Sequence, residues 1–185
     1  RLRGCARSRS IELPVSTAAT EDPTTMSKIA IGDPAPDIEV RATDEQSFGL
    51  SDFKGRNLVL YFYPKDNTPG CTTEGQDFRD HYEDFRKLKT EIFGVSRDSL
   101  KSHEGFKSKH CFPFDLISDD DEALCQLFGV IKEKNMYGKK VLGIERSTFI
   151  FDKDGVLRRE FRGVKVAGHV AEVLAEIRQL NKQKD

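Results

Sequence analysis

Apolar residues first concentrate in a continuous run from Leu58 to Tyr63, and this run predicts a central strand. A strand whose successive side chains are all apolar is covered on both faces, as in a largely parallel sheet. Pro64 ends the run, and the turn-rich residues 66–70 follow it. Beyond them, apolar side chains recur at helical spacing at Phe78, Tyr82, Phe85 and Leu88. The pattern therefore predicts a strand, a loop and a helix.

The alternation of strand and helix continues along the chain. Residues 92–96 and 114–117 predict two further strands, and residues 99–110 and 123–128 predict the helices that follow them. Strands that alternate with helices in this way are typical of an α/β fold.

The last third of the chain predicts an antiparallel pair and a closing helix. Residues 147–151 and 156–161 flank Asp152-Lys153-Asp154-Gly155, whose Asp-Gly pair suits the positive φ angles of a hairpin turn. The terminal segment is amphipathic, with one apolar face formed by Val170, Val173, Leu174, Ile177 and Leu180. We therefore expect a mixed central sheet flanked by helices.

The composition agrees with a globular domain. The 185 residues are 37% hydrophobic and 33% charged, which excludes a fibrous protein. A chain of this length buries roughly 70% of the surface of its unfolded form, so its core needs no disulfide or metal. The formal net charge is −1 with both signs interspersed, and we expect no binding to nucleic acid or to a membrane. The apolar runs also fall far short of the roughly 20 residues that span a bilayer.

The first 25 residues differ from the rest of the chain. They are rich in Ser, Thr, Ala and Pro, contain no aromatic residue and hold four arginines, namely Arg1, Arg3, Arg7 and Arg9. Such a segment predicts a disordered tail, either an artificial or mis-extended start or the remnant of a targeting sequence. Hydrophobic patterning begins at Met26, so we expect residues 26–185 to form the folded domain.

The cysteines and histidines give no sign of a metal site or a disulfide framework. Cys5, Cys71, Cys111 and Cys125 are irregularly spaced, and the four histidines are not clustered. The glycine motifs that bind nucleotides are absent, and so we expect no cofactor and no metal. Free cysteines suit a reducing compartment. We therefore expect a cytoplasmic protein, with import into an organelle if the tail is a targeting remnant.

Only Cys71 has neighbours that suggest chemistry. It lies at the junction of the predicted loop and helix, where free backbone N–H groups and the positive end of the helix dipole favour a thiolate. Gly70 allows a close turn there, Pro69 restricts the backbone, and the Thr68 hydroxyl can accept or donate a hydrogen bond. The plain alternative makes Thr68 a helix cap and Cys71 an inert filler.

The sequence around this cysteine resembles the active site of peroxiredoxins. Residues 64–71, Pro-Lys-Asp-Asn-Thr-Pro-Gly-Cys, have the form Pro-x-x-x-Thr-x-x-Cys, and residues 62–72 are similar to the peroxiredoxin Q (bacterioferritin comigratory protein) branch. Further similarity covers residues 94–99, 129–134 and 144–149 and extends over about residues 28–180. The resemblance implies a thioredoxin-like fold and a peroxidase that reduces hydrogen peroxide and organic hydroperoxides.

The resemblance also implies roles for individual residues. Cys71 would be the peroxidatic cysteine, whose thiolate attacks a peroxide oxygen and becomes a sulfenic acid. The charge that develops would be stabilised by the Thr68 hydroxyl, the Arg146 guanidinium and the backbone N–H groups of Gly70 and Cys71. Pro64 would shield the pocket from water, and Glu74 corresponds to a polar position near the active site.

The chain departs from the branch at the resolving cysteine. The position five residues after Cys71 is Gln76, and the alternative resolving position corresponds to Lys107. Cys111 lies one helical turn beyond, and we expect it to resolve the sulfenic acid, although direct reduction of a one-cysteine enzyme remains the alternative. Cys125 is expected to be inert in the core. The resemblance implies that a thioredoxin or glutaredoxin-like protein supplies the electrons to a monomeric enzyme.

Two other classes of protein compete with this interpretation. A binding protein with a thioredoxin-like fold would contain Cys71 as a structural residue, because a fold does not guarantee activity. A disulfide oxidoreductase would need a Cys-x-x-Cys motif, which is absent. The presence of both Thr68 and Arg146 favours the peroxidase.

Overall fold

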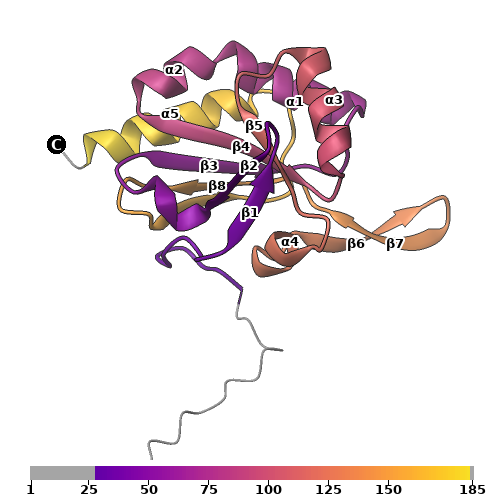
Figure 1. The fold of residues 1–185 in the computed structure, drawn as a ribbon. Helices are drawn as coiled ribbons and strands as arrows, with labels where there is room; N and C mark the ends of the chain where they lie inside the picture. Colours follow the sequence, from indigo (N-terminus) through magenta and orange to yellow (C-terminus); the bar gives the residue numbers. More distant parts are fainter. Residues whose placement is uncertain (1–27, 184–185) are drawn as a thin grey trace, which may run out of the picture.

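The computed structural model describes residues 28–183, so the predicted tail at residues 1–25 lies outside the described residues. A seven-stranded mixed sheet forms the centre, in the order β2-β1-β5-β4-β3-β8-β9 (Figure 1). Its strands in chain order are β1 (Glu39–Ala42), β2 (Gln46–Gly49), β3 (Asn57–Phe62), β4 (Thr90–Ser96), β5 (Asp115–Ser118), β8 (Ser147–Phe151) and β9 (Leu157–Phe161). The predicted α/β fold with a mixed sheet is confirmed.

Five α-helices and one 3-10 turn surround the sheet within the described residues. They are η1 (Leu50–Phe53), α1 (Pro69–Asp80), α2 (Tyr82–Lys87), α3 (Leu100–His110), α4 (Ala123–Leu127) and α5 (His169–Lys182). The single helix predicted through Phe78 and Leu88 is divided in two at His81. There the backbone leaves the helical region (φ −100°, ψ 4°), and the ring Nδ1 lies 2.9 Å from the carbonyl oxygen of Asp77. None of these helices is both long and apolar enough to cross a membrane.

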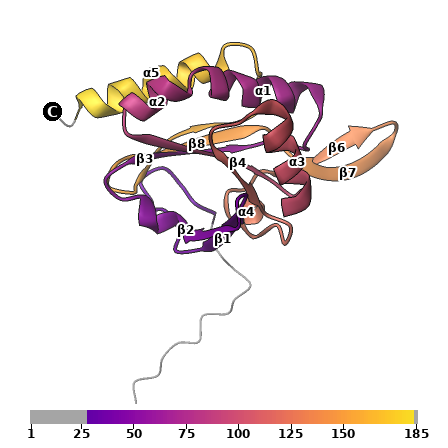
Figure 2. The same cartoon turned by 45° about the horizontal axis from the view of Figure 1, so that its top comes forward.

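Strand β3 is buried along its whole length, as its sequence predicts, and its side chains alternate between two cores. Leu58, Leu60 and Phe62 pack into the core that also contains α4. Val59 and Tyr61 pack into the core beneath α1, α2 and α5. Figures 1 and 2 show these three helices together on one face of the sheet, with α4 on the opposite side.

The neighbours of β3 bring distant segments of the chain together. Strand β4 runs parallel to β3, whereas β8 runs antiparallel to it, with Phe62 opposite Ser147. The carboxyl end of β3 therefore lies beside the amino end of β8. The loop that leaves β3 toward α1 and the residue that precedes β8 meet at the same edge of the sheet.

The sequence did not predict the paired strands β6 (Ile131–Met136) and β7 (Lys139–Ile144), which form a separate two-stranded sheet. It also did not predict β1 and β2. The β8–β9 hairpin was predicted, although only Gly155 of its turn has a positive φ, of 75°.

Candidate active site

Cys71 lies in the first turn of α1, directly after the loop that leaves β3. Thr68 is the N-cap residue with extended backbone angles, and Pro69 begins the helix. The first helical hydrogen bond in this turn runs from the Thr72 N–H to the Thr68 carbonyl at 2.9 Å. The N–H groups of Gly70 and Cys71 precede it and therefore have no acceptor within the helix. Cys71 is 2% exposed, so its thiol is buried beside the start of the helix.

Arg146 faces the sulfur from the position directly before strand β8. It stands between β7 and β8, and its Nη2 lies 3.4 Å from Sγ of Cys71 although the residues are 75 positions apart. The antiparallel pairing of β3 and β8 produces this contact. A Cβ atom at position 70 would lie 3.1 Å from the same nitrogen, so Gly70 leaves room for the guanidinium. The two residues that the resemblance paired are thus brought together.

Glu74 holds the other end of the guanidinium. Its Oε2 accepts a hydrogen bond from Nη1 of Arg146, and its side chain is fully buried one turn after Cys71. Burial raises the pKa of Glu74 to about 7, although the positive charge of Arg146 opposes this rise. The second oxygen, Oε1, is buried with no hydrogen-bond partner among the described residues. Glu74 therefore orients Arg146 rather than lying open to solvent.

The Thr68 hydroxyl donates its hydrogen bond within the loop, whereas the resemblance implied that it would stabilise negative charge at the sulfur. Its Oγ1 donates a hydrogen bond to the carbonyl oxygen of Lys65 at 2.8 Å. Because its proton is engaged there, the oxygen can accept a hydrogen bond from an incoming peroxide O–H group. The side-chain donor that faces the Cys71 sulfur is therefore Arg146. Pro64 is half-buried at the start of the same loop.

A buried polar network that the sequence did not reveal fixes this loop. The carboxylate of Asp66 accepts hydrogen bonds from the hydroxyls of Tyr63 at 2.6 Å and Ser102 at 2.8 Å, and Nδ1 of His103 lies 2.8 Å from it. The backbone N–H of Asp66 donates to the side chain of Asp98 at 2.9 Å. The network ties the loop to α3. Its only signals in the sequence were an acidic residue inside the motif and an isolated histidine.

Asp66, Asp98 and His103 also have donor atoms within 4.8 Å of one another, as metal ligands do. These atoms already have partners in the protein. His103 bonds the Ile117 carbonyl through Nε2 at 3.0 Å, and Ser96 donates to Asp98 at 2.6 Å. The cluster is therefore suited to holding the loop.

Cys111 lies at the exposed end of α3, as expected, and it adopts the left-handed conformation with φ 52°. The end of α3 rests against α1. Nε2 of Gln76 lies 3.4 Å from Nδ1 of His110, and Arg79 donates to the His110 carbonyl at 2.9 Å. Cys71 and Cys111 are both free thiols. The structure thus places Cys111 on the helix next to that of Cys71, without bonding the two.

Of the two remaining cysteines, Cys125 lies away from this site. Cys125 is fully buried in the core with α4, and burial raises the pKa of its thiol strongly. Its expected inertness agrees with this position. Cys5 lies outside the described residues.

A first-turn cysteine that faces an arginine on a mixed α/β sheet is suited to the chemistry of thiol-based redox enzymes, and comparisons with known proteins identify the family. The AhpC/TSA family matches residues 31–160. Peroxiredoxin Bcp of Bacillus subtilis is 50% identical over 155 residues, which cover 84% of this chain and 99% of that protein. Peroxiredoxin Bcp of Xanthomonas campestris is 59% identical over 129 residues, which cover 70% of this chain and 81% of that protein.

Solved structures agree with these relatives. The bacterioferritin comigratory protein of Xanthomonas campestris has a TM-score of 0.74 and 52% identity, covering 77% of this chain and 91% of that chain. The PrxQ protein of Xylella fastidiosa has a TM-score of 0.78 and 44% identity, covering 83% of this chain and 98% of that chain. The chain belongs to the AhpC/TSA family and is a peroxiredoxin of the Bcp or peroxiredoxin Q branch. The resemblance seen around Cys71 and the thioredoxin-like fold it implied are confirmed.

Proposed function

We propose that this peroxiredoxin reduces hydrogen peroxide and organic hydroperoxides through Cys71. The contact between the Arg146 guanidinium and the Cys71 sulfur, at 3.4 Å, carries the proposal. The thiolate attacks one peroxide oxygen, the O–O bond breaks, and the sulfur becomes a sulfenic acid. The other oxygen leaves as hydroxide or alkoxide and takes up a proton to give water or an alcohol.

The site supports this step with fixed donors. Negative charge spreads from sulfur over both oxygens in the transition state, and Arg146 with the N–H groups of Gly70 and Cys71 can stabilise it. Thr68 accepts the O–H of the peroxide, which orients the substrate. Pro64 shields the pocket, and Glu74 holds the guanidinium in place.

The relatives support an organic substrate. The bacterioferritin comigratory protein of Xanthomonas campestris is described as having alkyl peroxide reduction activity. We propose the same substrate class here, beside hydrogen peroxide.

We propose that Cys111 resolves the oxidised enzyme. Its thiol attacks the Cys71 sulfenic acid, water leaves, and an intramolecular disulfide forms. Two Cα atoms must approach within about 7 Å for this bond, so the end of α3 must move. A thioredoxin or glutaredoxin-like protein then reduces the disulfide in a monomeric cytoplasmic enzyme.

Substitution of Cys71 tests the peroxidase. Cys71→Ser should keep the fold and lose peroxide reduction, because a serine hydroxyl is a far weaker nucleophile at neutral pH. The assay measures peroxide consumption with dithiothreitol as reductant, with Cys125→Ser as the matched control. Equal turnover by Cys71→Ser and wild type would show that Cys71 is not the nucleophile, whereas no turnover by either protein would favour a binding protein with a structural cysteine.

Substitution of Cys111 tests the resolving step separately. Wild type treated with one equivalent of peroxide should yield a peptide in which residues 71 and 111 are linked, whereas Cys111→Ser should retain a sulfenic acid. Mass spectrometry distinguishes the two products. A sulfenic acid in both proteins, together with equal reduction by thioredoxin, would show that an external thiol reduces Cys71 directly.

A further inference from the structure

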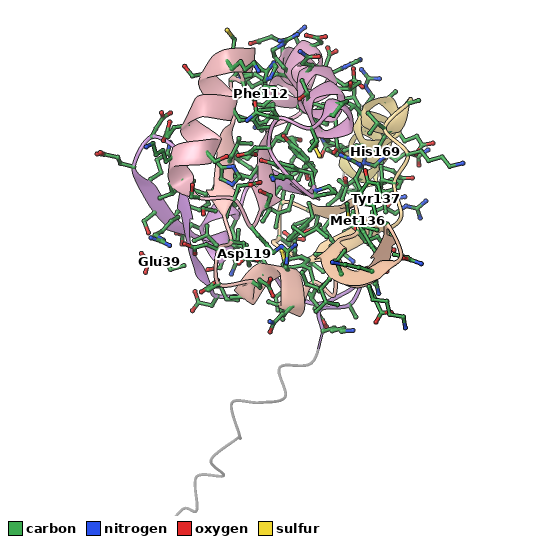
Figure 3. The ribbon with its side chains drawn as sticks, turned by 90° about the vertical axis from the view of Figure 1, so that its right-hand side faces the viewer. Glu39, Phe112, Asp119, Met136, Tyr137 and His169 are labelled. Atoms are coloured by element: carbon green, nitrogen blue, oxygen red, sulfur yellow. The ribbon has the colours of Figure 1, made fainter. Side chains whose placement is uncertain are left out.

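The β6–β7 hairpin stands apart from the body of the protein. Its two strands pair with each other and not with the seven-stranded sheet, and Tyr137 and Gly138 form its turn with positive φ angles of 52° and 76°. Figure 1 shows the hairpin projecting beyond the helices and the sheet. In Figure 3, which faces that side of the molecule, Met136 and Tyr137 lie at the front.

The hairpin carries most of the exposed large hydrophobic side chains of the described residues. Five large hydrophobic side chains are exposed in residues 28–183, and four of them lie here: Met136, Tyr137, Val141 and Leu142. Tyr137 is fully exposed and Leu142 is 63% exposed. Apolar side chains gathered on one projecting element indicate an interaction surface, and tyrosine is enriched among residues that dominate binding.

The charges on the hairpin indicate the chemistry of its partner. Residues 131–144 contain one acidic residue, Glu133, and four basic ones, namely Lys132, Lys134, Lys139 and Lys140. Glu133 pairs with Lys140 at 3.0 Å, which leaves an excess of three basic residues. A second copy of the chain would bring the same positive charge to the contact, and like charges disfavour that pairing. An acidic surface with apolar side chains at its centre complements the hairpin.

The base of the hairpin joins the active site. Strand β7 ends at Ile144, two residues before Arg146, and the Glu145 N–H donates to the Val130 carbonyl at 2.7 Å. Arg97 donates to the Leu142 carbonyl at 3.2 Å, which holds β7 against the end of β4. A protein bound to the hairpin would thus lie beside the pocket of Cys71.

We propose that the β6–β7 hairpin docks the protein that re-reduces the enzyme, a dithiol protein whose surface around its reactive thiol is acidic and apolar. This inference rests on the proposed function, which requires an external source of electrons. The partner dithiol supplies two electrons and two protons: the Cys71–Cys111 disulfide becomes two thiols as the partner forms its own disulfide. A Cys71 sulfenic acid would take the same two electrons and two protons, giving a thiol and water.

Two double variants test the docking surface. Tyr137→Ser/Leu142→Ser removes apolar contacts, and Lys132→Glu/Lys139→Glu reverses the charge at two exposed lysines. The matched controls are Ile31→Ser, the exposed hydrophobic residue outside the hairpin, and Lys87→Glu/Lys182→Glu on α2 and α5, far from the hairpin in Figure 1.

The assay compares peroxide turnover driven by thioredoxin with turnover driven by dithiothreitol. A small thiol needs no docking surface, so the ratio of the two kcat/KM values should fall about tenfold or more in each hairpin variant. It should stay within about twofold in the controls. The loss in the charge variant should shrink as salt is raised, because screening weakens the pairing of charges.

Several results would overturn the docking proposal. One is an unchanged ratio in both hairpin variants, and another is a failure of both thioredoxin and glutaredoxin to reduce wild type that turns over with dithiothreitol. If the variants lost self-association or binding to anionic vesicles while keeping the ratio, the hairpin would serve a second copy or a lipid surface. Failure of wild type to consume peroxide with dithiothreitol would instead refute the proposed function.

Discussion

Replacing Arg146 with alanine should separate catalysis from stability. The change removes the guanidinium nitrogen that lies 3.4 Å from the Cys71 sulfur. Loss of one strong electrostatic donor slows a reaction by about 100-fold or more, which is about 2.7 kcal/mol of transition-state stabilisation. The assay is single-turnover oxidation of the reduced enzyme by peroxide, and it is monitored through the loss of free thiol. Arg146→Lys retains the positive charge but lacks the planar guanidinium, so its oxidation rate should lie between those of wild type and Arg146→Ala.

The effect of Arg146→Ala on the free energy of unfolding depends on Glu74, which loses its ion-pair partner. The carboxyl is fully buried, and its pKa is about 7 in the presence of Arg146, whose charge opposes the effect of burial. Without Arg146 the burial and the nearby Asp77 raise that pKa further, so the carboxyl is protonated at pH 7. The variant then contains an unpaired neutral acid, at a cost of about 1–3 kcal/mol, rather than a bare buried charge at about 3–5 kcal/mol.

The dependence on pH identifies this cause. Because the folded pKa of Glu74 lies above its unfolded value, the folded chain binds a proton that the unfolded chain has released. The contribution is complete below the unfolded pKa of 4.5 and is lost as pH rises through the folded value. Arg146→Ala should therefore go on losing stability above pH 7, by up to about 1.4 kcal/mol per pH unit.

The double variant Arg146→Ala/Glu74→Gln completes the experiment. Glutamine does not ionise, so urea unfolding of the double variant should show no such loss above pH 7, whereas its oxidation by peroxide should stay slow. If Arg146→Ala reacted with peroxide at the wild-type rate, the guanidinium would have no part in the chemistry. If both variants lost stability equally above pH 7, Glu74 would not be the cause.

Two further predictions concern the packing around Gly75 and the loss of stability at acidic pH. Gly75→Ala would place a Cβ atom 2.5 Å from the buried Phe112 ring, so it should lower the free energy of unfolding by about 1–3 kcal/mol in urea titration; an unchanged midpoint would contradict the contact. His169 lies 2.7 Å from the Thr148 hydroxyl, and burial, aided by the positive charge of Arg146, lowers its pKa from 6.5 to about 4. Its neutral form is favoured in the fold, so its contribution is present above pH 6.5 and is lost as pH falls toward 4, by up to about 3 kcal/mol. His169→Gln should flatten this part of the stability profile, and an equally steep decline would assign it to other groups.

Burial explains which elements the sequence could predict. Strand β3 is covered on both faces, so its side chains are uniformly apolar and predict a strand directly. The strands β6 and β7 are mostly exposed, and no core imposes an alternating pattern on them. The break at His81 was missed because apolar spacing continues through Phe85 in α2. Local backbone geometry, rather than hydrophobic pattern, divides the two helices.

Some residues of the active site are close together in the sequence, whereas others meet only in the folded chain. Thr68, Gly70 and Cys71 are neighbours in sequence, so they could be considered together, but the resemblance was needed to choose a reactive cysteine over an inert one. Arg146 could be assigned only through the resemblance, because its contact depends on the pairing of β3 with β8. The direction of the Thr68 hydrogen bond and the network around Asp66 could not be predicted, because they depend on groups that the folded chain brings together.

The two halves of α3 are held by different contacts, and this difference bears on how Cys111 can move. Near its start, Ser102 and His103 join the buried network around Asp66, which fixes the active-site loop. At its end, α1 is joined to His110 by partly buried hydrogen bonds and contacts the ring of Phe112. Opening this end must break these hydrogen bonds and withdraw Phe112, which is buried directly after Cys111, from its contacts with Phe106 and Phe114. Unwinding from the end of α3 would release Cys111 while the network keeps the loop, and with it Thr68, in place.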